Sequence, residues 1–223
     1  MCLIEKDRDF KVGKSCGVIL AGGESRRFGR DKALVELGER RLIEYGVDSL
    51  HSIFEEVFIA ANKVRQFQYL DIPIVCDVIR GAGSLGGILT GLIHAKAEKC
   101  LVVACDMPLI NHALIRLLLD HSNDYDVVVP LVKGEPEPLH AIYTRRCIGP
   151  IVKMILKSDY RIVNLFNLVP TLKIEEEEWS YLDPEGTSFM NINTPADFQV
   201  ALRKLEQKEG MGKAYSQSER RSD

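Results

Sequence analysis

The stretch GVILAGGESRRFGRDKALVEL, residues 17–37, places flexible backbone and cations directly behind an apolar run. Gly22 and Gly23 end that run. Four cations follow within the next nine residues: Arg26, Arg27, Arg30 and Lys32. Glycine lets backbone amides approach a phosphate closely, and arginine and lysine neutralise its charge. A solvated surface loop is the commoner meaning of such a segment, so the rest of the chain must decide between a plain turn and a polyanion site.

Carboxylate and amide side chains follow other apolar runs of the chain. Asp77 comes directly after the run IPIVC, and Asp106 comes directly after CLVVAC. Asn191 and Asn193 stand just before the last helical pattern. A carboxylate at a strand end can hold Mg²⁺, which takes only one or two protein ligands and bridges phosphates. Glycines, cations, carboxylates and asparagines together predict a metal–nucleotide site.

Each of these residues also has a plainer interpretation. Gly22 and Gly23 could be turn glycines, and Asp106 could be a loop or cap residue. The histidines at 51, 94, 112, 121 and 140 form no ligand pair, so we interpret them as structural or surface residues. Ser25 has no local base partner, which argues against a nucleophilic serine. The chain lacks GxxxxGK[ST] and is therefore not a P-loop protein.

Strand-length apolar runs recur through the first two thirds of the chain, at 16–21, 56–61, 72–76, 100–105 and 125–130. They are near-continuous rather than alternating, which is typical of parallel strands covered on both faces. Helical patterns lie between them, at 41–54, 87–97 and 112–121, the last opened by Asn111 as an N-cap. We therefore predict a doubly wound α/β fold with a mostly parallel sheet and helices on both faces. Ligands bind at the carboxyl ends of the strands in such sheets, which would bring the candidate residues to one edge.

The last third of the chain is less regular. Residues 145–157 predict a helix, and a short strand near 172–174 runs into four glutamates at 175–178, which we interpret as a solvated edge or loop. The segment 189–206 passes from an extended run into a helix. Thr194 is its predicted N-cap, with Pro195 at the first helical position and Asp197 favoured by the helix dipole.

Length and composition set the domain organisation. The 223 residues are 46% hydrophobic and 27% charged, which is ordinary for a globular protein with a substantial core. We predict an N-terminal extension at 1–15, a single domain at 16–209 and a disordered tail at 210–223. A net charge of −3 argues against non-specific nucleic-acid binding.

The expected compartment follows from what the chain lacks. No apolar stretch approaches the roughly 20 residues needed to span a bilayer, and the opening residues do not read as a signal peptide. The six cysteines show neither CxxC nor metal-ligand spacing. We therefore expect a cytoplasmic protein with no membrane partner.

One motif suggests a different class of protein. GAGSLG at 81–86 matches GxGxxG, with Asp106 twenty residues beyond it, as in a Rossmann dinucleotide-binding unit. Four residues separate the preceding strand from these glycines, however, where the dinucleotide motif requires a tight turn. A nicotinamide-binding protein would also leave the cationic loop after the first strand unexplained.

Five motifs in order resemble the molybdenum cofactor guanylyltransferase family. The first loop fits the nucleotidyltransferase signature LAGG-x-S-x-R-x-G-x-D-K at 20–32. D-x-x-x-G-x-G-x-L-x-G follows at 77–87, CDMP at 105–108, EPLHAIY at 137–143 and NINTPAD at 191–197. The resemblance covers about residues 16–205, and it implies a Rossmann-like nucleotide-diphospho-sugar transferase fold. The GAGSLG glycines belong to this family pattern as well.

The resemblance implies a phosphoryl-type transfer. A terminal phosphate on molybdenum-molybdopterin attacks the α-phosphorus of GTP, and pyrophosphate leaves. The product is the guanine dinucleotide form of the cofactor, and Mg²⁺ is the implied metal. Such catalysis works mainly by positioning and charge neutralisation, so no side-chain nucleophile is required. GTP and molybdenum-molybdopterin are the implied partners, together with a molybdoenzyme or an insertion chaperone that receives the product.

The resemblance also assigns roles to single residues. The backbone that receives GTP is matched by Leu20, Ala21, Gly22 and Gly23. Lys32 matches the lysine that contacts the phosphates, with Arg27 assisting it. Asp77 matches a GTP-site aspartate, and Asp106 matches the Mg²⁺ ligand that also touches the nucleotide. Asn191 and Asn193 resemble the asparagines near the metal and the acceptor.

Few residues indicate which nucleotide base the protein would select. The family's guanine-pocket asparagine aligns with Ala60 here, while Asn62 lies two residues further on. LAGG in place of LAAG resembles guanylyl rather than cytidylyl transferases, because Gly22 leaves more room for a purine. The alternatives are a cytidylyltransferase for the same cofactor, another small-acceptor nucleotidyltransferase, or a non-catalytic carrier of nucleotide or cofactor.

Overall fold

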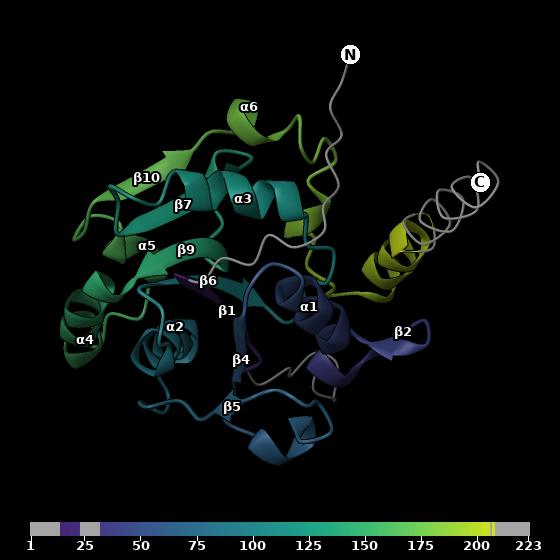
Figure 1. Ribbon diagram of the computed structural model, residues 1–223, viewed down its shortest axis with the longest axis horizontal. Coiled ribbons are helices and arrows are strands. Elements are labelled where there is room, and N and C mark those ends of the chain that lie inside the picture. Colours follow the sequence, from purple (N-terminus) through teal and green to yellow (C-terminus); the bar gives the residue numbers. More distant parts are fainter. Residues whose placement is uncertain (1–13, 23–31, 206, 208–223) are drawn as a thin grey trace, which may run out of the picture.

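The computed structural model describes residues 14–22, 32–205 and 207, arranged around one mixed β-sheet (Figure 1). The strand order is β10–β7–β9–β6–β1–β4–β5, with β8 paired to β7. The strands are β1 (Ser15–Leu20), β4 (Glu56–Ala60), β5 (Ile74–Val75), β6 (Lys99–Ala104), β7 (Val127–Val132), β8 (Glu135–Pro136), β9 (His140–Thr144) and β10 (Thr171–Ile174).

The six predicted strands are confirmed as β1, β4, β5, β6, β7 and β10. β1 pairs in parallel with β4 and β6, and the pairs β4–β5 and β7–β10 are parallel too. β9 runs antiparallel between β6 and β7, which the sequence interpretation did not foresee. The predicted fold class, a mostly parallel sheet with helices on both faces, is confirmed.

Each face of the sheet carries its own apolar core. α2 (Gly83–His94) and α4 (Ile148–Leu156) cover one face, while α1 (Leu42–His51) and α3 (His112–Asp120) cover the other. α1 and α2 lie on opposite sides of β1 and β4 (Figure 1). Successive residues of β1 serve the two cores, since Val18 packs with α2 and Ile19 packs with α1.

α2 begins inside the glycine-rich segment, four residues earlier than predicted. A Cβ on Gly86 would lie 2.8 Å from the Ala82 Cβ and 3.1 Å from the Ile79 carbonyl oxygen. A Cβ on Gly87 would lie 3.1 Å from the Leu20 side chain. Gly87 therefore lets α2 approach the end of β1 closely, and Gly86 leaves room for the preceding turn at 79–82. The motif serves helix–strand packing as well as turning the chain.

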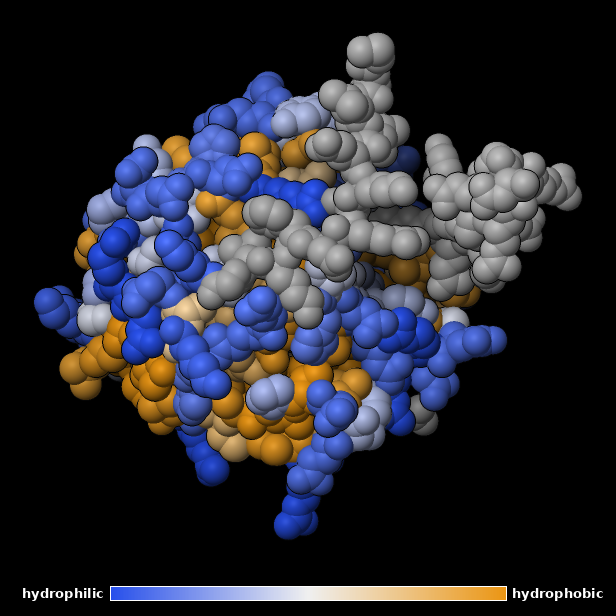
Figure 2. All heavy atoms as spheres, viewed as in Figure 1, coloured by the Kyte–Doolittle hydropathy of each residue, from blue (hydrophilic) through white to orange (hydrophobic). Residues whose placement is uncertain are grey.

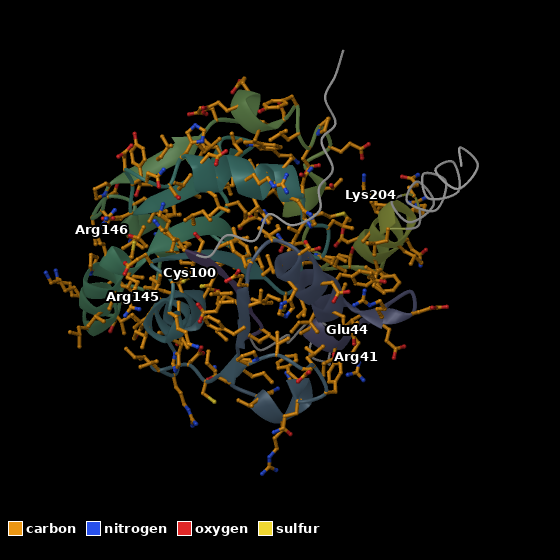
Figure 3. The ribbon with its side chains drawn as sticks, in the orientation of Figure 1. Arg41, Glu44, Cys100, Arg145, Arg146 and Lys204 are labelled. Atoms are coloured by element: carbon orange, nitrogen blue, oxygen red, sulfur yellow. The ribbon has the colours of Figure 1, made fainter. Side chains whose placement is uncertain are left out.

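α3 has its predicted cap, and α1 has a cap that was not predicted. The Asn111 side chain accepts hydrogen bonds from two backbone amides of the first turn of α3. At α1, the Arg41 backbone N–H donates to Glu44 Oε2 at 3.3 Å (Figure 3). The caps fix where each helix leaves the site edge of the sheet.

The C-terminal region adds short elements around the sheet. The predicted helix at 145–157 is a 3₁₀ turn, η3 (Arg145–Cys147), followed by α4. The four glutamates are exposed, as predicted, but they do not form a loop, because they cap and open a short helix, α6 (Glu176–Trp179), that ends on a buried tryptophan. The remaining short elements are η1 (Lys32–Leu34), β2 (Glu36–Leu37), β3 (Arg40–Arg41), η2 (Val64–Phe67), α5 (Ile162–Leu165) and η4 (Thr187–Phe189).

The final helix, at 195–205, has the predicted start. Thr194 Oγ1 accepts from the Asp197 backbone N–H at 3.2 Å, and the Asp197 carboxylate accepts from the Thr194 N–H at 2.7 Å. Lys204 near the end of this helix forms an ion pair with Glu185 (Figure 3). The helix is therefore held to the domain at both ends.

Some apolar side chains lie on the surface. Figure 2 shows orange spheres where Figure 1 places α4, and Leu156 at the end of this helix is 80% exposed. None of the described residues predicted for the site is among the exposed large hydrophobics. The site must therefore be located from its polar groups.

Other predictions concern residues at the ends of the chain. The predicted tail at 210–223 lies outside the described residues, as does the N-terminal extension apart from Lys14 and Ser15. Within the described ranges, no helix is long and apolar enough to cross a membrane.

Candidate functional site

Four strands end side by side at one edge of the sheet. The ladder continues past the strand ends in three backbone hydrogen bonds: Ala21 N–H to Ala60 O at 3.0 Å, Ala61 N–H to Val75 O at 2.9 Å, and Cys105 N–H to Leu20 O at 3.1 Å. The loops after β1, β4, β5 and β6 are thereby fixed next to one another. This is the edge at which an open α/β sheet binds its ligands.

A cavity of about 470 Å³ lies along this edge. Its walls are the residues after β1, those after β4, Asp77 and the glycine-rich start of α2. Leu20, Ala21, Gly22 and Asp77, all predicted site residues, line it together. Its small and flexible walls leave backbone accessible, which suits a nucleotide better than an apolar ligand.

Asp77 and Asn62 form the polar wall of this cavity. Asn62 Nδ2 donates a hydrogen bond to Asp77 Oδ2 at 2.6 Å. Burial raises the pKa of Asp77 above its ordinary value, and the Asn62 hydrogen bond partly opposes that rise. Ala60 supplies only a methyl group to the cavity, and Asn62 supplies an amide at this wall.

Asp106 lies against the two predicted asparagines. The Ile192 backbone N–H, between Asn191 and Asn193, donates to the Asp106 backbone oxygen at 3.0 Å. The Ile192 side chain is buried in a third apolar cluster with Leu109 and residues of the final helix. The Asn193 N–H donates to the Asp197 carboxylate at 2.9 Å, so the cap of the final helix sets the position of this segment.

The donor set near Asp106 fits a magnesium ion. Asp106 offers a carboxylate, and the adjacent asparagines offer amide oxygens, which are the hard ligands that Mg²⁺ takes. No group of three or more histidine, cysteine, aspartate or glutamate side chains in the described ranges could hold a metal by itself. Mg²⁺ usually completes its shell with water and substrate phosphates, so a site with one carboxylate is sufficient.

The cationic loop is only partly visible in the described residues. Gly23 and Arg27 lie in the segment outside them. Lys32 opens η1, and its side chain also lies outside what is described, while the following Ala33 is buried against α1. The loop therefore leaves from the cavity wall at Gly22 and re-enters the fold beside α1.

Glu137 is a further carboxylate at this edge, and sequence reasoning treated it only as part of a motif. It opens a turn closed by the His140 N–H to Glu137 O hydrogen bond at 3.2 Å. The turn lies against the end of β6, because Ala104 N–H donates to Leu139 O at 3.0 Å. A carboxylate that follows a hairpin and precedes a buried strand is the signal that could have identified it.

His140 is buried behind the same turn. Its ring packs edge-on against Phe189, with centroids 5.2 Å apart, and neither ring nitrogen has a hydrogen-bond partner. Burial lowers the pKa of His140 from 6.5 to about 4, although the charge of Asp183 opposes this shift. The residue is structural, in keeping with the sequence interpretation of the histidines.

The arrangement as a whole can hold a nucleotide with its phosphates near Asp106. Among the described thiols, neighbouring groups and burial raise the pKa of Cys16, and burial raises the pKa of Cys147, which argues against an activated nucleophile at either position. The chemistry that fits is transfer of a phosphoryl-containing group by positioning and charge neutralisation.

Comparison with known proteins bears on this chemistry. Residues 17–169 match the family model described as the MobA-like NTP transferase domain. A probable molybdenum cofactor guanylyltransferase of Pelotomaculum thermopropionicum is 38% identical over 188 residues, 84% of this chain and 92% of that relative. The one of Carboxydothermus hydrogenoformans is 38% identical over 197 residues, 86% of this chain and 96% of the relative. The solved structure of molybdopterin-guanine dinucleotide biosynthesis protein A from Archaeoglobus fulgidus aligns with a TM-score of 0.75 and 26% identity, covering 86% of this chain and 98% of that one.

Proposed function

Because the chain belongs to the family of MobA-like NTP transferase domains, we propose that it transfers GMP from GTP to molybdenum-molybdopterin. The protein is a nucleotidyltransferase. An oxygen of the acceptor's terminal phosphate attacks the α-phosphorus of GTP and forms a new P–O bond. The bond from the α-phosphorus to the bridging oxygen breaks, and pyrophosphate leaves with that electron pair. The product is the guanine dinucleotide form of the cofactor.

One observation supports the proposal: the nucleotide-sized cavity lies at the same edge of the sheet as Asp106, which follows the neighbouring strand β6. Leu20, Ala21 and Gly22 line the cavity, and the Cys105 backbone N–H bonds to Leu20 O directly before Asp106. In this proposal the base enters the cavity and the phosphates extend along the edge toward Asp106. That is the placement needed for attack at an α-phosphorus.

Guanine suits the polar wall of the cavity. Asp77 presents a carboxylate, which accepts hydrogen bonds, and guanine offers the adjacent N1–H and 2-amino donors. Adenine and cytosine have a ring nitrogen acceptor where guanine has N1–H, so a carboxylate would repel it. Asn62 holds one Asp77 oxygen at 2.6 Å and leaves the other for the base.

The remaining predicted residues serve the phosphates and the metal. Lys32 and Arg27 neutralise the triphosphate and the leaving pyrophosphate, as cations do in phosphoryl transfer. Asp106, with Asn191 and Asn193, would hold Mg²⁺, which when bound neutralises charge on the reacting phosphates. Gly23, the next residue in the sequence after Gly22, is proposed to offer its amide to the phosphates.

The cellular setting is part of the proposal. We place the protein in the cytoplasm, with residues 16–209 as one nucleotidyltransferase domain. A molybdoenzyme or an insertion chaperone would receive the product, because a finished cofactor must pass to the protein that uses it.

Titration calorimetry with GTP, CTP and ATP in the presence of Mg²⁺ is the direct test, followed by pyrophosphate release with molybdenum-molybdopterin. We expect preferential binding of GTP and release of pyrophosphate only with acceptor. Preference for CTP would make the protein a cytidylyltransferase on the same fold. Nucleotide binding without turnover would indicate a carrier and contradict the proposal.

A further inference from the structure

The strand order divides the site into two halves. Asp106 follows β6, and the nucleotide cavity lies over β1, β4 and β5 on one side of it. β9 is the neighbour of β6 on the other side, and the turn at 137–140 leads into β9. If GTP occupies the first half, as the proposed function requires, the acceptor must approach Asp106 over the second. The turn is therefore part of the acceptor half.

Hydrogen bonds from β9, β6 and β7 hold the turn at 137–140 in place. The fully buried Tyr143 donates its hydroxyl hydrogen to Pro138 O at 2.8 Å. The Ala104 N–H bonds to Leu139 O, and the Glu137 N–H donates to Pro130 O of β7 at 2.9 Å. Bonds from three strands fix the backbone, so a ligand that meets this turn meets a preorganised surface.

The Glu137 carboxylate is also fixed in position, and its Oε2 atom is left available to a ligand. Oε1 accepts from the Leu139 backbone N–H at 3.1 Å. No ion pair within the described part of the chain involves Glu137, and Oε2 has no bonded partner there. Burial and the nearby Asp106 charge raise the pKa of Glu137, while the Leu139 amide opposes this. A half-buried carboxylate without a cation costs free energy until a donor reaches it.

The chemistry of the acceptor decides what that donor is. The phosphate of molybdopterin and the sulfur and oxygen atoms around molybdenum are acceptors or anions, which a carboxylate repels. The pterin ring alone offers an adjacent ring N–H and a 2-amino group. Oε2 can accept from one of these donors, and the remaining lone pair of Oε1 can accept from the other, in charge-assisted hydrogen bonds. Pro138 and Leu139 add half-buried apolar surface beside it, which suits a planar ring.

We propose that Glu137 binds the pterin ring of the acceptor through the ring N–H and the 2-amino group, and so sets acceptor affinity and specificity. This inference rests on the proposed function. Guanine carries the same donor pair, but the polar wall formed by Asp77 and Asn62 lies in the nucleotide half. Glu137 therefore discriminates pterins, and Asp77 discriminates nucleobases.

The test compares Glu137→Gln with Glu135→Gln in the full-length enzyme. Glutamine keeps an oxygen for the Leu139 N–H but replaces the free carboxylate oxygen with an amide group. Glu135 is exposed in β8, two residues away, and its variant removes the same charge. We expect Glu137→Gln to raise the KM for molybdenum-molybdopterin roughly 10- to 100-fold, the loss typical of a hydrogen bond to a charged group. The dissociation constant for GTP should stay within about twofold, and Glu135→Gln should match the wild type in both.

A second experiment measures the binding of the pterin ring without the rest of the acceptor. Fluorescence titration with 2-amino-4-oxopteridine and with 2,4-dioxopteridine, which lacks the amino group, should show a wild-type preference for the former. Glu137→Gln should abolish that preference. An unchanged acceptor KM, an unchanged pteridine preference, or an equal loss of GTP affinity would each overturn the inference. If the wild type transfers no GMP, the proposed function fails, and the pteridine preference still tests Glu137.

Discussion

Acid should destabilise this protein through a single buried histidine. His140 is completely buried, with no hydrogen-bond partner on either ring nitrogen, and its pKa is lowered to about 4 by burial. In the unfolded chain an ordinary histidine titrates near 6.5. As the pH falls below 6.5, the unfolded chain takes up a proton that the folded chain refuses, so stability decreases until the pH falls below the folded pKa.

The size of the effect follows from those two values. The difference between 6.5 and about 4 limits the contribution to about 3 kcal/mol, of which about 2 kcal/mol should be lost between pH 7 and pH 5. Asp183 is the charged group that faces His140, and its attraction for the imidazolium is the smaller effect. Its carboxylate is already occupied by Thr187 and Ser188.

Urea unfolding at pH 7 and pH 5 measures this loss. Trp179, the only tryptophan, packs against Phe189 at a centroid distance of 4.9 Å, so its fluorescence reports on the region around His140. His140→Leu removes the titrating ring without removing a hydrogen bond, and it should lose about 2 kcal/mol less than the wild type over this interval. The exposed His121, changed to Gln, serves as the control and should keep the wild-type loss. An equally steep loss in His140→Leu would refute the reasoning.

Three other substitutions test the candidate site and the packing at the start of α2. Asp106→Asn should lower kcat by roughly 100-fold or more, because metal catalysis supplies several kcal/mol, and change the free energy of unfolding by only about 1 kcal/mol. A near-normal kcat in single-turnover experiments would remove Asp106 from the site. Asp77→Asn should weaken GTP binding roughly tenfold in calorimetry and reduce the preference over ATP, since an amide can donate to the ring nitrogen of adenine. Unchanged selectivity would count against base reading by Asp77. Gly86→Ala should reduce the urea unfolding free energy by about 1–3 kcal/mol, because its Cβ would meet Ala82 at 2.8 Å. Full stability would show that the turn at 79–82 can shift away from position 86.

The parallel half of the fold could be predicted because its strands are buried on both faces. Runs such as 100–105 and 56–61 are apolar at nearly every position, and that pattern is typical of strands between two helical layers. The α3 start was equally clear, because Asn111 is both a good N-cap and the residue before an apolar periodicity. Local chemistry and tertiary structure agree at these positions.

Elements that depend on distant partners were missed. β9 is only five residues long, and its antiparallel direction depends on pairing with β6 and β7. The start of α2 at Gly83 was placed too late, because glycines usually break helices and here permit close packing on Leu20.

The site was predicted in outline. Asp77 and Asp106 could be identified because each follows a strand, and the structure places both at the same edge. The Asn62–Asp77 hydrogen bond joins loops after different strands, so neither sequence neighbourhood shows it. Glu137 lies 31 residues beyond Asp106 in the chain, and only the reversed direction of β9 brings the two together.

Because β9 runs antiparallel to β6, the two halves of the site should differ in how well they tolerate insertions and deletions. The nucleotide half is made of parallel strands, and the connections after β1 and β5 lead to α1 and α2, so a length change there displaces a helix packed on the core. The turn at 137–140 follows a short hairpin, β7–β8, whose tip at Lys133 and Gly134 is exposed. Insertions at that tip would reshape the acceptor half while the strands that carry the nucleotide keep their pairing. A lineage could thus exchange one phosphorylated acceptor for another without rebuilding the machinery that handles the nucleotide.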